Sequence, residues 1–256
     1  MYNTTEITSS EISSDNPIHQ RLVKAYIEAR QFVDGSVLEI GCGIGRGLQW
    51  FLDRCKKYTA IDKNKKLIQQ LEQLYPQHLF IAMNIPPMSD IPDESFDTIL
   101  SFQVIEHIHQ DELFMSEIYR ILKPGGKVIL TTPNIRFSLT RNPWHVREYS
   151  AGKFEKLFSK FFEQVEMYGI QGNEKVMQYY ERNKESVSKI TKYDVLNLQY
   201  LLPRQLLQIP YDILNRFNRI QLQKQHDGLT TGITEKDYSL CQEPEKSLDL
   251  FYIGKK

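Results

Sequence analysis

A glycine-rich segment gives the strongest chemical signal in the chain. Glycines stand at 41, 43, 45 and 47, directly after a strand-like run at 37–40. Because glycine has no Cβ, such a loop can turn sharply and lie against a ligand, and a helix beginning behind it offers unpaired N–H groups to a phosphate or carboxylate. The dinucleotide-binding pattern G-x-G-x-x-G would need glycine at 46 or 48, where the chain has Arg46 and Leu48. The segment therefore predicts a small-ligand site that is not a typical dinucleotide site.

Two carboxylates lie close to this loop. Glu39 stands two residues before Gly41 inside an otherwise apolar run, and a buried carboxylate needs a partner. Asp62 ends the next apolar run, where an acid can cap the following helix, expected to start at Asn64. Cys42, inside the loop, is expected to serve as a small residue and not as a nucleophile.

His107 and His145 are the residues best suited to proton transfer, because histidine can act as a general base near neutral pH. His145 follows the fifth expected strand, at the edge where α/β sheets bind ligands, and Trp144 and Glu148 lie beside it. For His107 the alternatives are an acid–base or substrate-orienting role and a packing role at a helix start. For His145 they are substrate orientation and fastening of its loop onto the next helix.

Seven runs have the length and composition of strands, with helical patterns between most of them. The expected strands cover residues 36–40, 58–62, 79–83, 97–102, 127–132, 164–170 and 248–253. Helical spacing is found from residue 16 to Gly35, from the glycine loop to about 55, and at 64–75, 107–122 and 150–162. Alternating strands and helices imply crossover connections, so we expect an α/β fold with a mostly parallel sheet covered on both faces.

The motifs resemble those of the class I S-adenosylmethionine-dependent methyltransferases, in particular type 11 and type 12 bacterial members. An acid two residues before G-x-G-x-G resembles the first motif of that family, and Asp62 ends the second strand as the family's acid does. Further similar segments lie at 84–85, 92–100, 103–108, 122–127 and 142–150. The likeness covers about residues 18–172 and the last strand. Each motif alone is weak, but their order and spacing together are specific.

The resemblance implies a Rossmann-like, seven-stranded sheet, a helical insertion before the last strand, and S-adenosyl-L-methionine as cofactor. In the family, the acid at Asp62 accepts hydrogen bonds from the ribose hydroxyls, and the acid at Glu39 orders the loop and the amino group of methionine. The segment at Asn84 contacts adenine, although many members have Asp there. The implied cofactor-binding residues are Glu39, Gly41, Cys42, Gly43, Gly45, Asp62, Lys63, Asn84, Ile85, Phe102 and Gln103.

The resemblance also bears on a metal near the acceptor. In related ubiquinone-biosynthesis O-methyltransferases, an E-x-x-E-H segment at the position of Glu106 and His107 is associated with a divalent metal. This chain has Gln103 at the first acid, and a neutral amide is a poorer ligand for Mg²⁺. No metal is predicted, and His107 and His145 are the predicted catalytic residues.

The chain divides into three expected parts. Residues 1–15 are a flexible lead-in, residues 16–172 and 246–256 form the methyltransferase core, and residues 173–245 form a mostly helical insertion that serves as lid, substrate or dimer element. Within the insertion, 200–224 is amphipathic and basic. We expect its apolar face to pack on the domain or on a second subunit. Peripheral membrane contact or an anionic acceptor is the alternative.

Composition narrows the class of protein. The 256 residues contain 32 basic and 32 acidic side chains, which argues against a dedicated nucleic-acid partner. No apolar run approaches the roughly 20 residues of a membrane span, and the polar N-terminus does not resemble a signal peptide. Three cysteines without a CxxC pair suit a reducing cytoplasm.

Three functions remain open at this point. The first is an S-adenosylmethionine-dependent methyltransferase, most simply acting on oxygen of a small-molecule, sugar or lipid-linked acceptor. The alternatives are an NAD(P)-dependent oxidoreductase on a Rossmann sheet, disfavoured by the broken glycine pattern, and a non-catalytic S-adenosylmethionine-binding module.

Overall fold

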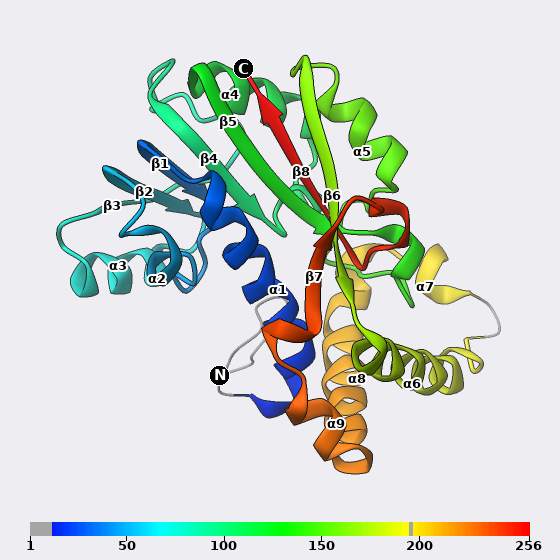
Figure 1. Cartoon of the computed structure of the whole chain (residues 1–256). Coiled ribbons are helices and arrows are strands. Elements are labelled where there is room, and N and C mark those ends of the chain that lie inside the picture. The colour runs from blue at the N-terminus through cyan, green and yellow to red at the C-terminus, as the bar shows by residue number, and fades with distance from the viewer. Residues whose placement is uncertain (1–11, 195–196) are drawn as a thin grey trace.

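The architecture is a single sheet with helices on both faces (Figure 1). The structure, a computed structural model, describes residues 12–194 and 197–256. The strands are β1 (Ser36–Ile40), β2 (Lys57–Asp62), β3 (Leu79–Ala82), β4 (Phe96–Phe102), β5 (Leu122–Pro133), β6 (Gln164–Gly172), β7 (Tyr238–Cys241) and β8 (Asp249–Lys255). The helices are α1 (Asn16–Ala29), α2 (Leu48–Phe51), α3 (Lys65–Leu74), α4 (Asp111–Ile121), α5 (Ala151–Phe158), α6 (Glu174–Thr191), α7 (Leu198–Leu201), α8 (Arg204–Gln225) and α9 (Asp227–Gly232).

The strand order explains where a ligand site should lie. The order is β3-β2-β1-β4-β5-β8-β6-β7, with parallel pairing from β3 through β5 and antiparallel pairing for β8, β6 and β7. The chain runs outward from β1 in one direction and resumes at β4 on the other side. In such sheets the crevice outside the carboxyl ends of these two strands is the usual ligand site.

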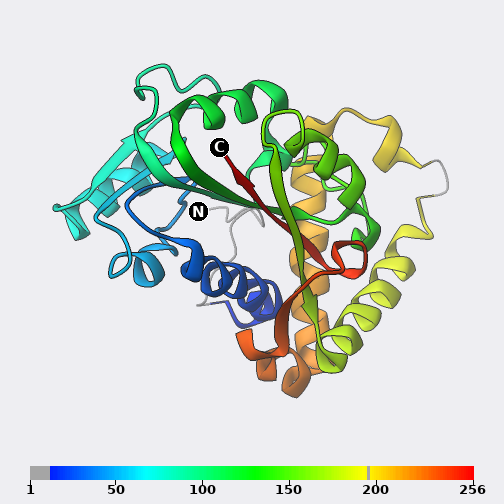
Figure 2. The ribbon, with the colours of Figure 1, turned by 45° about the horizontal axis from the view of Figure 1, so that its top comes forward.

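Helices cover both faces of the sheet (Figure 2), and alternating side chains of each strand join two separate clusters of buried apolar residues. Val37 and Leu100 pack with residues of α1, α2 and α3 on one face. Leu38 and Ile99 pack with residues of α4 and α5 on the other face. The expected Rossmann-like α/β fold with a mostly parallel sheet is thus confirmed.

The sheet has eight strands where the sequence predicted seven. The additional strand is β7, which lies in the stretch expected to be a helical insertion and pairs antiparallel with the end of β6. It has only four residues, too few for a two-residue periodicity to stand out. Four helices are also clearly shorter than expected: α1 ends at Ala29, α2 at Phe51 and α5 at Phe158, and α4 begins at Asp111 because residues 105–107 form a separate 3-10 turn.

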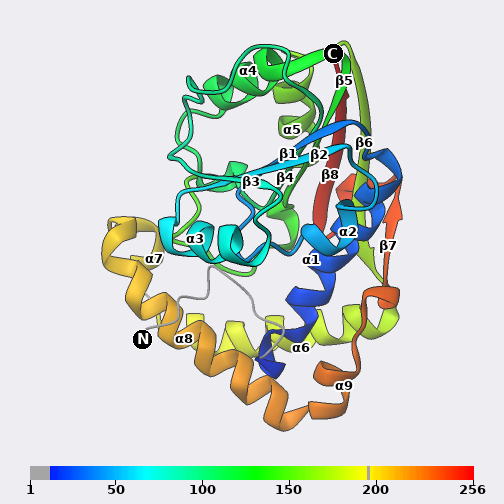
Figure 3. The same cartoon turned by 90° about the vertical axis from the view of Figure 1, so that its left-hand side faces the viewer.

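A third layer of helices lies beyond the carboxyl ends of the parallel strands (Figure 3). In this layer α8 packs against α6 and α9, and α9 contacts α1. The helix α8 presents its polar face inward: Asp212, Asn218 and Arg219 are buried, whereas Ile213 and Phe217 are exposed. The expectation that its apolar face packs on the domain was therefore wrong. The polar face can be buried because the neighbouring segments supply hydrogen-bond and ion-pair partners.

The most buried of these partners is Asp15. Its Oδ1 accepts from Arg216 Nη1 at 2.7 Å and from Arg219 Nη1 at 2.9 Å. Of the lead-in expected at residues 1–15, residues 1–11 lie outside the described part of the chain. Ser13–Asp15 form a 3-10 turn in which Asp15 is fully buried, so this end of the lead-in is fixed structure. None of the helices in the described ranges is long and apolar enough to cross a membrane.

The Asp15 ion pairs predict a large stability effect. Asp15→Asn leaves two guanidinium groups without their carboxylate in a buried setting, so the free energy of unfolding should fall by about 3 kcal/mol. Asp53→Asn is the matched control, since Asp53 pairs with Arg30 at the surface, where such pairs contribute about 0–1 kcal/mol. Urea unfolding followed by circular dichroism measures both. Equal losses in the two variants would contradict the role of Asp15.

Candidate functional site

The glycine loop is fastened to the end of β2 by three backbone N–H groups. Those of Gly41 and Cys42 donate to the carbonyl of Ile61 at 2.8 and 3.2 Å, and that of Gly43 donates to Asp62 Oδ2 at 2.9 Å. Gly41 has φ +76°, a left-handed conformation that side chains with a Cβ rarely adopt. A Cβ there would also lie 2.3 Å from Val104 Cγ2. Glycine is therefore required at this turn.

Asp62 serves the loop and not the helix that follows it. Its Oδ1 accepts from the backbone N–H of Asn64 at 2.8 Å. The cap of α3 is Asn64 itself, whose Oδ1 accepts from the N–H groups of Lys66 and Leu67. The alternative that Asp62 caps this helix is thus excluded. A carboxylate has two lone pairs on each oxygen, so Asp62 retains capacity to accept from a ligand's hydroxyls.

Glu39 lies beneath the loop, fully enclosed. Tyr26 donates its hydroxyl to Oε1 at 3.0 Å, and Tyr58 donates to Oε2. A Cβ added to Gly47 would lie 2.1 Å from Oε2, so the carboxylate also fixes how closely the loop approaches β1. Burial raises the pKa of Glu39 to about 7, even though both tyrosine hydrogen bonds act in the opposite direction.

A cavity of about 390 Å³, here called the glycine-loop cavity, opens over these residues. It lies at the switch between β1 and β4 that the strand order indicated. Of the predicted cofactor-binding residues it is lined by Gly41, Cys42, Gly43, Asp62, Lys63, Asn84, Ile85, Phe102 and Gln103. Glu39 and Gly45 support the loop from outside the lining. Sequence analysis missed Leu22 and Tyr26 of α1, which also line it, because nothing in an amphipathic helix shows which turn will face a ligand.

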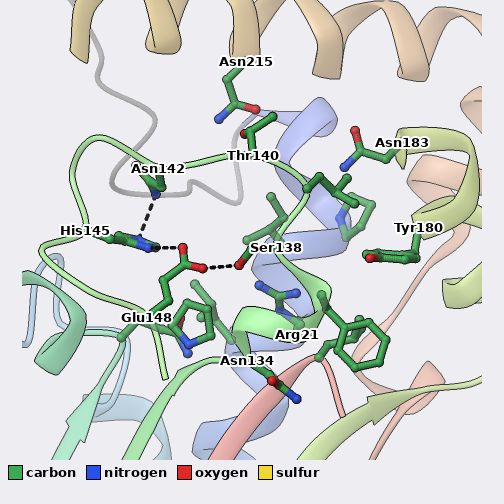
Figure 4. Close-up of a pocket in the computed structure, with 18 of the residues that line it drawn as sticks. Arg21, Asn134, Ser138, Thr140, Asn142, His145, Glu148, Tyr180, Asn183 and Asn215 are labelled. Carbon is green, nitrogen blue, oxygen red and sulfur yellow. Dashed lines mark hydrogen bonds and ion pairs between the residues drawn. The ribbon is translucent and has the colours of Figure 1, made fainter. Parts of the chain in front are cut away.

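A second cavity of about 280 Å³, here called the histidine cavity, adjoins the first (Figure 4). The two share Leu22, Gln103 and His107 in their linings. Helices α6 and α8 contribute Tyr180, Asn183 and Asn215, which no local motif marked in the sequence (Figure 4).

His107 and His145 come together in the histidine cavity, with ring centroids 5.0 Å apart and planes near perpendicular. The carbonyl of Trp144 lies 3.0 Å from His107 Nδ1, and a carbonyl can only accept. Nδ1 of a neutral His107 therefore carries the proton, and Nε2 keeps its lone pair. This is the form required of a general base.

His145 is held at both ring nitrogens (Figure 4). Asn142 Oδ1 accepts from the N–H of Trp144, so its Nδ2 donates to His145 Nε2 at 2.8 Å. His145 Nδ1 then donates to Glu148 Oε1 at 2.7 Å, and Ser138 donates to the other oxygen of Glu148. The loop expected to hold His145 thus fixes the tautomer and the orientation of its ring.

Glu106, His107 and His145 are close enough to be metal ligands, with their ligand atoms all within 4.8 Å of one another. Glu106 is buried and accepts from Thr132 Oγ1 at 3.1 Å. A metal would have to displace Asn142 from His145 Nε2 to use all three groups. That no metal binds stays a prediction.

Comparison with known proteins shows which family this fold and this site resemble. The family model described as "Methyltransferase domain" matches residues 38–130. This part of the chain therefore matches a methyltransferase domain. The sequence resemblance is therefore confirmed, and S-adenosylmethionine is the cofactor of the family.

Two curated relatives and one solved structure set the range of the likeness. The chain is 34% identical over 145 residues to a probable S-adenosylmethionine-dependent methyltransferase of Mycolicibacterium smegmatis, covering 55% of this chain and 54% of that protein. It is 31% identical over 106 residues to malonyl-[acyl-carrier protein] O-methyltransferase of Salmonella typhimurium, covering 41% of each. A methyltransferase structure from Thermotoga maritima, described as a possible histamine N-methyltransferase, superposes with a TM-score of 0.59 at 16% identity, over 96% of this chain and 95% of that one.

The likeness to the curated relatives extends over part of their length. The chain spans about half the length of the curated relatives it matches. The structural neighbour, at 16% identity, shares the fold.

The residues of the methyltransferase domain fit its cofactor. Asp62 offers carboxylate oxygens at the end of β2, as ribose hydroxyls require, and Met83, Ile85 and Ile108 supply apolar walls for a flat base. The loop around Gly43 leaves open space where a side chain would otherwise stand, because a Cβ there would meet no atom within 4 Å.

Asp62 provides the first test of this fit. Asp62→Ala removes the acceptor for ribose hydroxyls and for the Gly43 N–H, so binding of S-adenosylhomocysteine should weaken at least about tenfold. Isothermal calorimetry measures the affinity, and Asp90→Ala, an exposed acid outside the cavity, is the control. Unchanged affinity in Asp62→Ala, or binding of NADH in place of S-adenosylhomocysteine, would contradict the assignment.

The pKa of Glu39 predicts a pH dependence of stability. The folded chain holds this proton up to about pH 7, whereas an unfolded chain releases it near the ordinary value of 4.5. Folded Glu39 therefore contributes most below pH 4.5 and loses about 3 kcal/mol as the pH rises to 7. Glu39→Gln cannot titrate, so the free energy of unfolding of the wild type should fall relative to the variant between pH 5 and pH 8 in urea titrations. A constant difference would disprove the shift.

Proposed function

We propose that this chain transfers a methyl group from S-adenosylmethionine to a hydroxyl oxygen of an acceptor bound in the histidine cavity. The observation that carries the proposal is the junction of the two cavities at Gln103 and His107. A cofactor in one cavity and an acceptor in the other would meet beside an imidazole whose Nε2 is ready to accept a proton. Holding two reactants in line is worth up to roughly 7–11 kcal/mol in such a displacement.

The chain's own residues supply positioning and proton transfer. The cofactor, when bound, supplies an electrophilic methyl group on a positively charged sulfur. His107 Nε2 takes the proton of the attacking hydroxyl, and the hydrogen bond from Nδ1 to the Trp144 carbonyl keeps the ring in place. The nearby Glu106 carboxylate stabilises the positive charge that His107 gains.

His145 acts beside His107 as an orienting group. Asn142 and Glu148 fix its ring, whose edge-to-face contact limits the rotation of His107. Since both nitrogens of His145 are already hydrogen-bonded, we assign the primary proton transfer to His107 and the placement of the acceptor to His145.

The charges around the histidine cavity favour a neutral acceptor. Arg21 is paired with Asp249 at 3.0 Å and Arg219 with Asp15, so both guanidinium groups on the wall already have carboxylate partners. The remaining carboxylates of the lining, Glu106 and Glu148, would repel an anion. Side-chain amides, hydroxyls and aromatic rings such as that of Tyr180 suit an uncharged polyhydroxylated unit, as in a sugar or a lipid-linked sugar. An anionic acceptor, the alternative raised by the basic insertion, is correspondingly disfavoured.

Two other assignments have less support. An oxidoreductase would use the dinucleotide pattern that Arg46 and Leu48 interrupt. A non-catalytic module would not need the hydrogen bonds that hold His107 and His145 in defined tautomers. A cytoplasmic location, membrane contact through 200–224 and a homodimer remain predictions.

His107→Ala is the decisive variant. Loss of the general base should lower turnover about 10²–10⁴-fold, while S-adenosylhomocysteine affinity stays within a few-fold. Turnover is measured by release of S-adenosylhomocysteine with a panel of simple alcohols, methyl glycosides and their phosphorylated counterparts.

The panel and a second variant separate the outcomes. Wild-type transfer to neutral members, and not to the phosphorylated ones, supports the acceptor class. His145→Ala should impair turnover mainly through a higher KM for the acceptor. Full activity of His107→Ala would rule out its role as base. S-adenosylhomocysteine binding with no transfer to any acceptor would favour the non-catalytic module.

A further inference from the structure

The helix α8 exposes an apolar stripe four turns long on the side away from the domain. The stripe, here called the outer stripe, consists of Leu206, Ile209, Ile213, Phe217 and Ile220. The side chains of Leu206 and Phe217 are 64% and 61% exposed, so most of their apolar surface is in contact with water. Contiguous apolar surface of this kind marks a contact site on a folded protein. At one end it continues into exposed Leu201 and Leu202.

The opposite face of α8 is polar and committed to the domain. Trp144 Nε1 donates to Asp212 Oδ1 at 3.2 Å, Ser186 Oγ donates to Asn218 Oδ1 at 2.6 Å, and Arg219 pairs with Asp15. These contacts fix the rotation of the helix about its axis. The outer stripe therefore cannot turn inward without breaking buried ion pairs, so its exposure belongs to the folded chain.

The spacing of the outer stripe is symmetric about its centre. Ile209 and Phe217 lie four residues from Ile213 on either side, and Leu206 and Ile220 lie seven residues from it. The steps of three, four, four and three residues keep these side chains on one face of the helix, as in a helix that packs along another helix. A helix whose pattern is the same in both directions can pair with its own copy across a two-fold axis, since that axis joins identical patches.

We propose that two copies of this chain associate through α8, antiparallel, with Ile213 on the two-fold axis. In this arrangement Ile209 of one copy meets Phe217 of the other, and Leu206 meets Ile220. The stripe brings no like charges together, because its members are all apolar and the exposed neighbours Gln205 and Gln221 are uncharged. The proposal goes beyond the proposed function and does not depend on it.

Charge decides against a lipid surface as the occupant. A helix lying on anionic lipid keeps lysine and arginine free at the edges of its apolar face. In α8, Arg204 donates to the carbonyl of His145, and Arg216 and Arg219 pair with Asp15. The three arginines of residues 200–224 are thus directed into the domain, and Lys224 is exposed beyond the carboxyl end of the outer stripe.

Dimer formation would affect the acceptor site, because α8 forms part of the wall of that site. The inner face of α8 contributes Tyr211, Asn215 and Arg219 to the histidine cavity. A partner helix packed on the outer stripe would hold this wall from behind, so both copies would support the acceptor walls of each other.

Cysteine cross-linking tests the register. Ile213→Cys should form a disulfide-linked dimer on mild oxidation, because the two cysteines meet at the axis. Leu206→Cys alone should not, since its two copies would lie roughly 21 Å apart along the helix at 1.5 Å per residue. The double variant Leu206→Cys/Ile220→Cys should cross-link again. The wild type, with its own Cys42, Cys55 and Cys241, gives the background.

Sedimentation equilibrium tests the association without cysteines. Phe217→Glu should weaken the dimer at least about tenfold, and adding Ile209→Lys to it should restore most of the affinity by setting opposite charges across the interface. Leu74→Glu, a substitution of an equally exposed leucine on α3, is the matched control and should remain dimeric. Retained S-adenosylhomocysteine binding shows that each variant is folded.

Three results would overturn the proposal. The wild type could remain monomeric over the whole concentration range. Leu206→Cys alone could cross-link, which would mean a parallel pair. The monomer could instead float with vesicles of phosphatidylcholine and phosphatidylglycerol and lose this binding in Phe217→Glu, which would assign the outer stripe to a lipid surface.

Discussion

The enclosed carboxylate of Glu39 joins the parts of the cofactor site. It stands on β1, accepts hydrogen bonds from α1 and β2 through Tyr26 and Tyr58, and lies so close to Gly47 that a Cβ there would collide with it. Burying a charge-bearing group is unfavourable unless its hydrogen bonds are made, so these contacts must form together. The conformation of the glycine loop follows from this constraint, and with it the direction of the Gly43 N–H group that donates to Asp62.

The acceptor site depends on contacts between segments far apart in sequence. Asp15, near the start of the described chain, anchors Arg216 and Arg219 of α8, and Arg21 of α1 pairs with Asp249 of β8. These ion pairs neutralise the guanidinium groups nearest to the histidine cavity. Under the proposed function, the same charges would serve stability and acceptor specificity, since a carboxylate that lets an arginine be buried also removes it as a partner for an anionic acceptor.

Local patterns were enough to predict the parallel half of the fold and the shared location of most of the proposed cofactor-binding residues. The glycines at 41–45 and Asp62 follow directly from strand–loop–strand order, and nine predicted cofactor-binding residues line one cavity because the carboxyl ends of neighbouring parallel strands share an edge. Glu39 was correctly expected to need partners, but its tyrosine partners are 13 and 19 residues away and belong to no motif. The walls supplied by Tyr180, Asn183 and Asn215 depend on how α6 and α8 pack, which no spacing within either helix records.

The orientation of α8 shows most clearly what a sequence pattern does not predict, namely which face of a helix turns inward. An amphipathic pattern gives the angle between two faces of a helix, and the usual inference is that the apolar face turns inward. Here the inward face of α8 lies against Asp15, Ser186 and Trp144. Each of them forms a hydrogen bond or an ion pair with a side chain of α8, so burying the polar face is favourable. In the proposed dimer, a helix so placed would turn a polar wall toward the acceptor and an apolar surface toward the second copy. The two faces of one helix would then connect acceptor recognition to association.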